Sequence, residues 1–135
     1  MAKIVLDSWG LLAFFEDDPA AEMIENIILD AESGKHHLFL SALDWSEIYS
    51  SIMSRASQQA AEEKMRQISE LPIEIVSVGD DLALLRQAAI YRATHKLAAA
   101  CAFAGALAKM RKTVLATGEP SFRVLEGQIK IQWLT

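Results

Sequence analysis

Short apolar runs alternate with longer amphipathic segments along the chain. The apolar and β-branched runs are typical of buried strands and predict them over residues 3–6, 37–40, 73–78, 113–116 and 129–133. Apolar side chains at helical spacing predict helices over residues 9–15, 20–32, 57–71 and 97–110, after Ser41, and from Asp80 through Arg92. Strands that alternate with helices favour an α/β fold, here a three-layer α/β/α arrangement around a central, mainly parallel sheet of about five strands.

Residues that start and stop helices lie at the ends of these segments. Ser8 and Ser41 are the expected N-caps, because a serine hydroxyl accepts a hydrogen bond from a free backbone N–H of the first turn. Asp17-Asp18-Pro19 ends one helix and starts the next, since proline suits the first helical turn. The segment Thr117-Gly118-Glu119-Pro120 is predicted to form a turn after the fourth strand.

Length and composition predict one domain over residues 1–135, with 52% hydrophobic residues to form its core. No apolar run approaches the roughly 20 residues of a membrane-spanning helix, and the N-terminus reaches a charge too soon for a signal peptide. The single cysteine, Cys101, excludes an internal disulfide framework. We therefore expect a cytoplasmic protein with no membrane partner.

The net charge of −5 argues against a protein that coats nucleic acid without regard to sequence, because such proteins are strongly basic. It is compatible with an enzyme that holds nucleic acid through a metal ion, since a metal site of that kind needs an excess of carboxylates.

Two acidic residues follow predicted strands directly. Asp7 comes after the first strand and Glu119 after the fourth. Because polar chemistry collects beyond the carboxyl ends of parallel strands, we expect both to lie at the same edge of the sheet. Each also has a plain structural interpretation: Asp7 as a helix cap and Glu119 as part of a surface turn. Glu47, six residues beyond Ser41, would from spacing alone be an ordinary solvent-facing residue.

Four segments in this order together resemble the PIN domain family. They are Val5-Leu6-Asp7-Ser8; Leu40-Ser41-Ala42 followed by Glu47-Ile48-Tyr49; His95-Lys96-Leu97 followed by Ala102-Phe103-Ala104; and Leu115-Ala116-Thr117-Gly118 followed by Pro120-Ser121-Phe122. The resemblance covers nearly the whole chain and is closest to the toxins of bacterial toxin–antitoxin pairs, by compact length and by the ending over residues 124–134. It implies a PIN-type ribonuclease that uses Mg²⁺ or Mn²⁺ to hydrolyse RNA, with a homodimer and a cognate antitoxin protein as expected assemblies.

The resemblance also implies roles for particular residues. Asp7, Glu47 and Glu119 match three of the family's metal-binding and catalytic acids, and Ser8 and Thr117 take positions beside the substrate.

Cys101 stands where the family has its remaining acid, an aspartate. A thiol is mostly protonated at neutral pH, and sulfur is a poor ligand for Mg²⁺. Asp44, three residues before Glu47 on the same helix face, is a candidate replacement acid.

One alternative stays open, and two others lack residues that they need. A degenerate PIN domain, with weak or no catalysis because of Cys101, would act as an RNA- or protein-binding module. A phosphoryl-transfer domain of the receiver or dehalogenase kind also places an aspartate after a strand, but its other acids have no counterpart, and Trp9 occupies the position of the second dehalogenase aspartate. A nucleotide-binding oxidoreductase would need a glycine-rich fingerprint after the first strand, which the sequence lacks.

Several other potentially reactive residues can also be explained by structural roles. Cys101 in an alanine-rich helix is most simply a small buried side chain, although His95 is near enough in sequence to suggest a thiol–histidine pair. His36 and His37 are adjacent on a strand, so their rings point to opposite faces and rarely share one ion. Arg92, His95 and Lys96 either stabilise a helix C-terminus or contact a phosphate backbone.

Overall fold

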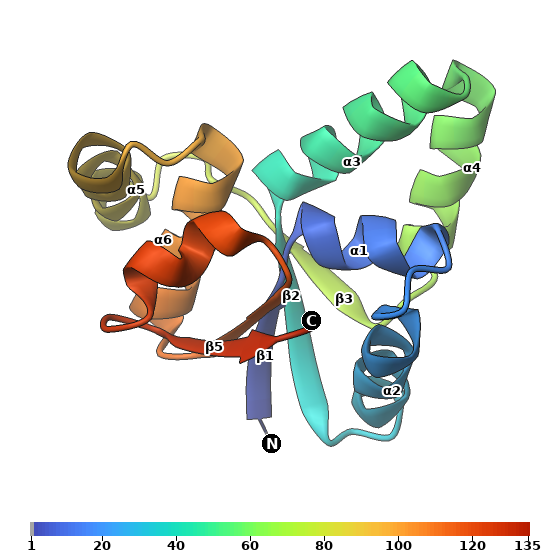
Figure 1. Cartoon of the computed structure of the whole chain (residues 1–135), viewed down its shortest axis with the longest axis horizontal. Coiled ribbons are helices and arrows are strands. Elements are labelled where there is room, and N and C mark those ends of the chain that lie inside the picture. The colour runs from blue at the N-terminus through green and yellow to red at the C-terminus, as the bar shows by residue number, and fades with distance from the viewer. Residues whose placement is uncertain (1) are drawn as a thin grey trace.

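Five parallel strands form one sheet in the computed structural model, which describes residues 2–135 (Figure 1). They are β1 (Ala2–Leu6), β2 (His36–Ser41), β3 (Ile73–Val76), β4 (Val114–Thr117) and β5 (Lys130–Trp133). The order across the sheet is β3-β2-β1-β4-β5, and every neighbouring pair is parallel. The predicted α/β class and parallel sheet are confirmed. The central place of β1 puts its carboxyl end, and Asp7 directly after it, in the middle of one sheet edge.

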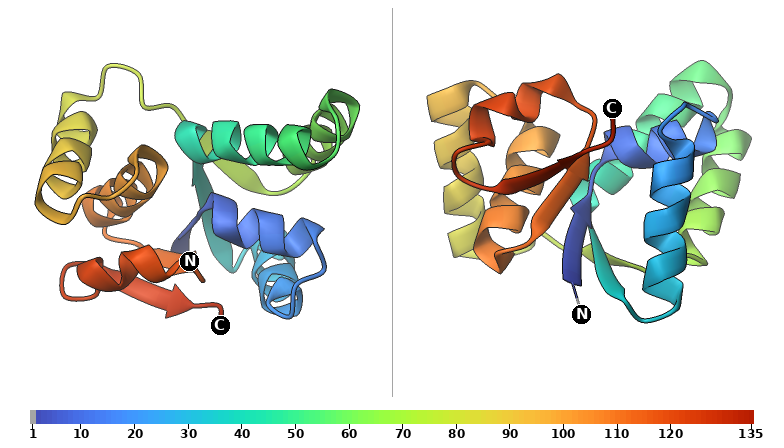
Figure 2. Two further views of the ribbon diagram at one scale, coloured as in Figure 1. Left: turned by 45° about the horizontal axis from the view of Figure 1, so that its top comes forward. Right: turned by 60° about the horizontal axis from the view of Figure 1, so that its bottom comes forward.

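Helices cover both faces of this sheet (Figures 1 and 2). They are α1 (Ser8–Phe15), α2 (Ala21–Glu32), α3 (Ala42–Arg55), α4 (Gln58–Ser69), α5 (Leu82–His95) and α6 (Ala99–Arg111), with a 3₁₀ helix, η1 (Pro120–Leu125). One face packs against α5, α6 and η1, and the other against α1, α2, α3 and α4. The result is the predicted three-layer arrangement.

Alternation along the strands divides the core in two. Val5 and Phe39 point into the cluster with α5 and α6, whereas Ile4, Leu6 and Leu40 point into the cluster with α1 to α4. Because successive strand side chains face opposite sides, a strand buried on both faces must be apolar at every position. That requirement explains the continuous apolar runs of β1 and β2, which end only where the polar residues of the sheet edge begin.

The helix starts show where the sequence expectation was right and where it was wrong. Ser41 caps α3 as predicted, with its hydroxyl accepting from the Leu43 N–H at 3.2 Å. Asp7, and not Ser8, caps α1, because its Oδ1 accepts from the Gly10 N–H at 3.0 Å and Ser8 is already helical. The predicted turn at Thr117–Pro120 leads into η1, which the sequence analysis did not anticipate. None of the helices within residues 2–135 combines the length and apolar character needed to cross a bilayer.

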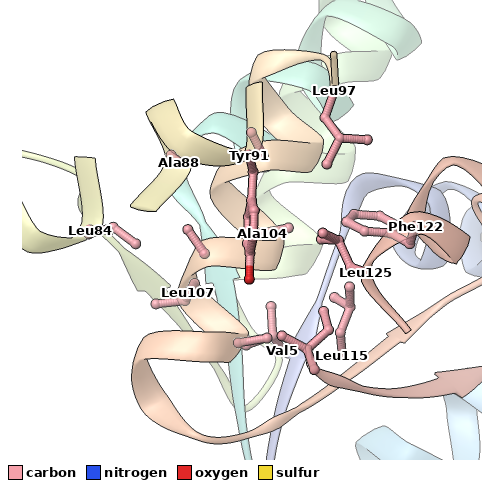
Figure 3. Close-up of a cluster of buried hydrophobic side chains, with 14 of the residues drawn as sticks. Val5, Leu84, Ala88, Tyr91, Leu97, Ala104, Leu107, Leu115, Phe122 and Leu125 are labelled. Atoms are coloured by element: carbon pink, nitrogen blue, oxygen red, sulfur yellow. The ribbon is translucent and has the colours of Figure 1, made fainter. Parts of the chain in front are cut away.

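Tyr91 on α5 is the largest fully buried side chain, and its hydroxyl has no hydrogen-bond partner (Figure 3). A buried hydroxyl without a partner costs about 1–3 kcal/mol. We therefore expect Tyr91→Phe to leave the free energy of unfolding unchanged or to raise it by about 1 kcal/mol, whereas Tyr91→Ala lowers it by about 3–5 kcal/mol. Urea denaturation of both variants measures this. A clear loss of stability in Tyr91→Phe would show that the hydroxyl has a partner in solution.

Candidate active site

Asp7 is fixed at the carboxyl edge of the sheet by two hydrogen bonds. It is 3% exposed; Oδ1 accepts from the Gly10 N–H at 3.0 Å and Oδ2 from the Thr117 hydroxyl at 2.6 Å. The strand register explains the second bond. Leu6 pairs with Leu40 on β2 and with Ala116 on β4, so the next residues, Asp7 and Thr117, stand side by side. Burial raises the pKa of Asp7 to about 6. The two hydrogen bonds act in the opposite direction, and the negative charge of Glu119 adds to the rise.

Thr117 connects Asp7 to the turn that carries Glu119. Its hydroxyl donates to Asp7, and its oxygen accepts from the Glu119 N–H at 3.0 Å. Glu119 then caps η1, with Oε1 accepting from the Ser121 N–H at 3.2 Å and from the Ser121 hydroxyl at 2.8 Å. The glutamate is half-buried and close enough to Asp7 to act on its pKa. The structure therefore places Asp7 and Glu119 at the same edge.

Asp44, in the first turn of α3, is buried beside Asp7. Its Oδ1 accepts from the Ser8 N–H at 3.1 Å, while Oδ2 is buried with no hydrogen-bond partner. Burial, followed by the charge of Asp7, raises the pKa of Asp44 well above its usual range, and Glu47 adds to the shift. Asp44 was a candidate replacement acid from the sequence because of its spacing from Glu47, but the spacing did not predict its burial. Its burial against the start of α1 depends on how the two helices pack.

Glu47 and Cys101 complete the cluster. Glu47 lies one turn beyond Asp44 and is exposed; Cys101 lies in the first turn of α6 and is half-buried. Burial raises the pKa of the Cys101 thiol to about 12, and the charges of Asp7, Asp44, Glu119 and Glu47 all contribute. The charges of four carboxylates therefore act on a neutral thiol. A thiol with a pKa of about 12 is a poor nucleophile, and His95 contacts Gln128 and Tyr91 instead, so the thiol–histidine interpretation has no support.

The charges of this acidic cluster are not balanced by a cation from the described part of the chain. Within residues 2–135, none of the ion pairs formed by lysine, arginine or histidine involves Asp7, Asp44, Glu47 or Glu119. Two carboxylates about 4 Å apart repel by roughly 4 kcal/mol at an effective dielectric constant of about 20, so a divalent cation would relieve the repulsion. The donor set is entirely carboxylate oxygen, which suits Mg²⁺ and Mn²⁺, and Asp44 Oδ2 is a buried oxygen without a partner.

The side chains do not form a closed cage as they stand. Across the described residues 2–135, no group of three or more acidic, histidine or cysteine side chains is arranged to hold a metal ion. Asp7 and Asp44 are buried and tethered by backbone N–H groups, but Glu47 and Glu119 are at least partly exposed. A bound ion would therefore require side chains of this cluster to move from the positions described here.

The histidines do not join this cluster. His36 Nε2 lies 3.5 Å from Asp30 and His37 Nε2 lies 3.3 Å from Glu74, so the two rings have different partners. Arg92 and Lys96 are exposed near the end of α5, just before the helix that carries Cys101.

Residues 4–127 match the PIN domain family, and this range spans nearly the whole chain, so the chain belongs to that family. Comparison with curated protein sequences gives no match.

Several solved structures share the fold. A chain of VapBC2 from Rickettsia felis, bound to a DNA fragment from the VapBC2 promoter, has a TM-score of 0.76 at 10% identity. The match covers 96% of this chain and 97% of the VapBC2 chain. DNA-bound VapBC from Salmonella typhimurium gives 0.74 at 14% identity over 100% of both chains. A toxin–antitoxin complex from Klebsiella pneumoniae gives 0.69 at 16% identity over 98% of each. At such identities the likeness shows the PIN fold, and these neighbours are toxin–antitoxin proteins.

The pKa of Asp7 predicts how stability depends on pH when divalent ions are absent. Below its ordinary value of 3.8 the carboxyl is neutral in both the folded and the unfolded chain; between 3.8 and about 6 only the unfolded chain loses the proton readily. Burial of the charged carboxylate therefore lowers the free energy of unfolding progressively as pH rises from 3.8 to about 6. Above pH 6 the total loss is about 3 kcal/mol. We expect Asp7→Asn, in EDTA, to be more stable than the natural protein at pH 7.5 and to show a shallower loss between pH 4 and 6.

Urea denaturation across this pH range measures the effect, and Asp80→Asn, at an exposed acid, serves as the matched control. Lower stability of Asp7→Asn at pH 7.5, with an unchanged pH slope, would contradict the expectation.

Gly118 lets Trp9 pack over the turn beside the site. A β-carbon at Gly118 would overlap the indole ring of Trp9, which is too rigid to yield. We expect Gly118→Ala to lower the free energy of unfolding by about 1–3 kcal/mol, because overpacking shifts α1 or the turn. Thermal unfolding measures this, and Gly127→Ala is the control, since a β-carbon there has open space. Equal stability of the two variants would show that the indole moves freely.

Proposed function

We propose that this PIN domain is a divalent-metal-dependent ribonuclease, in which Asp7, Glu47 and Glu119 hold Mg²⁺ or Mn²⁺ and direct hydrolysis of RNA phosphodiester bonds. The observation that carries the proposal is a group of acidic side chains near the carboxyl edge of a PIN fold, whose charges act on one another and on Cys101 and which pair with no cation within residues 2–135. Chemistry is expected at that edge of a parallel sheet.

The proposed roles of these residues differ according to their hydrogen bonds. Asp7 has both oxygens in hydrogen bonds, which fixes the direction of its remaining lone pairs. Thr117 positions Asp7 and the Glu119 backbone together, and Ser8 supplies a backbone N–H to Asp44. A divalent ion bound there would lower the pKa of a water molecule and stabilise negative charge on the phosphate. We assign Thr117 and Ser8 to positioning of the acids and of the substrate backbone.

Cys101 favours a second candidate function. The neutral thiol adds no charge and no hard ligand at the position where the family has an acid. A degenerate PIN domain, folded but weakly active or inactive, would then act as an RNA- or protein-binding module.

A protein partner is part of the proposal. The structural neighbours are toxin–antitoxin proteins, which supports a cognate antitoxin for this chain and a place in the cytoplasm beside its RNA target. The surface available for a partner, whether the antitoxin or a second copy in a homodimer, includes the outer side of α3. There Trp45 stacks with Tyr49 at 5.9 Å and, with Met53, lines a shallow cavity of about 500 Å³.

The test is cleavage of a fluorescent single-stranded RNA in Mg²⁺, in Mn²⁺ and in EDTA. We expect cleavage only with a divalent ion, and a loss of about 100-fold or more in Asp7→Asn, since even residues that merely orient metal ligands are worth 10–100-fold. Asp80→Asn, at an exposed acid away from the cluster, is the control. Cleavage that survives Asp7→Asn would exclude the acidic cluster as the site. Cleavage that appears only after Cys101→Asp would favour the degenerate module.

A further inference from the structure

We propose that Asp44 is a ligand of the divalent ion and replaces, from α3, the acid that position 101 on α6 no longer supplies. This inference rests on the proposed metal-dependent function. It adds a residue that the family pattern does not assign, and it predicts that Asp44 and Cys101 are coupled.

The first observation is an oxygen without a partner. Asp44 is 2% exposed, its Oδ1 accepts from the Ser8 N–H at 3.1 Å, and its Oδ2 is buried with no hydrogen bond. A buried polar atom left unpaired costs about 1–3 kcal/mol, and more when it is charged. A cation beside Oδ2 would satisfy that oxygen and remove the cost.

The second observation is the position of the carboxylate. Ser8, which tethers Asp44, directly follows Asp7, so the two aspartates are held by adjacent backbone units at the start of α1. The charges of Asp7 and Glu47 both act on Asp44, and the charge of Asp44 acts on Cys101. Asp44 therefore lies within the cluster, between the acids that the proposed function already uses.

The third observation is that α3 and α6 contact each other. Asp44 lies in the first turn of α3 and Cys101 in the first turn of α6, and the charge of Asp44 acts on the thiol. With a neutral thiol at Cys101, the four carboxylates of the cluster are Asp7, Asp44, Glu47 and Glu119, the same number that the family resemblance implies. An acid lost from one helix is matched by an acid on the facing helix.

A purely structural role for Asp44 makes a different prediction. As a tether for Ser8 it needs only an acceptor oxygen, which an asparagine side chain also provides. Asp44→Asn therefore keeps the tether and removes the charge. Asp81→Asn is the control, because Asp81 Oδ1 also accepts from a backbone N–H, that of Leu84 at 3.1 Å, but Asp81 is exposed and lies outside the acidic cluster.

The test is Mn²⁺ titration by isothermal calorimetry, with the rise in melting temperature on Mn²⁺ addition as a second readout. We expect Asp44→Asn to weaken Mn²⁺ binding about 10–100-fold, Asp81→Asn to leave it unchanged, and Cys101→Asp in the Asp44→Asn background to restore it to within a few-fold of the natural protein. Circular dichroism without metal checks the fold, and Asp44→Ser replaces Asp44→Asn if the latter does not fold.

The outcomes separate this inference from the proposed function. If Asp44→Asn binds Mn²⁺ like the natural protein while Asp7→Asn does not bind, Asp44 is only a tether, and the metal site stands without it. If Asp44→Asn weakens binding and Cys101→Asp restores nothing, Asp44 contributes to binding but does not replace the acid of position 101, and the proposed exchange between the two helices is wrong. If the natural protein binds no Mn²⁺, or Asp7→Asn binds it equally well, the proposed function itself fails.

Discussion

The hydrogen bond from Thr117 to Asp7 holds the candidate site together. It joins the end of the central strand, β1, to the end of its neighbour β4, where the apolar strand residues are followed by the polar residues of the sheet edge. Through the same hydroxyl, the bond connects a buried carboxylate to the backbone of Glu119. Without it, the charge of Asp7 would be buried with a single donor, and the turn that carries Glu119 would lose its anchor. Hydrogen bonds to a charged group are among the stronger ones in a folded protein, which suits this position.

Three helices begin at this edge, and that arrangement makes an acidic cluster tolerable before any cation binds. Asp7 caps α1, Asp44 lies in the first turn of α3, and Cys101 lies in the first turn of α6. Each helix N-terminus carries partial positive charge from its free N–H groups, equivalent to roughly half an elementary charge. The Gly10 and Ser8 N–H groups donate directly to the two buried carboxylates. The fold thus offsets part of the repulsion that the acids create.

Much of this edge follows from the sequence alone. The apolar strands and helical spacing place Asp7 and Glu119 after parallel strands, and Ser41 is a cap in both sequence and structure. The prediction of Ser8 as the cap of α1 was wrong because the helix begins at Ser8 itself, one residue before the predicted start at Trp9, so that Asp7 becomes the cap. The 3₁₀ helix η1 was missed since six residues starting at Pro120 carry no clear periodicity, and burial of Phe122 and Leu125 holds it in place.

The environment of Asp44 could not be predicted from the residues near it in the sequence. Its spacing from Glu47 is visible in the sequence, but its unpaired Oδ2 results from the packing of α3 against α1 and α6, elements far apart along the chain.

The two buried aspartates and the two more exposed glutamates differ in stiffness, and this difference has a consequence for selectivity. Asp7 and Asp44 have lost their rotamer freedom on folding, so their positions are set before anything binds. Glu47 and Glu119 keep longer stems and more freedom. A metal centre of this kind would combine two fixed aspartate ligands with two adjustable glutamate ligands. Selectivity between a small and a large ion would then depend on how closely the two glutamates can approach the two aspartates. Glu119 has one methylene more than an aspartate would have, so it extends further but is held less tightly, which favours the larger ion.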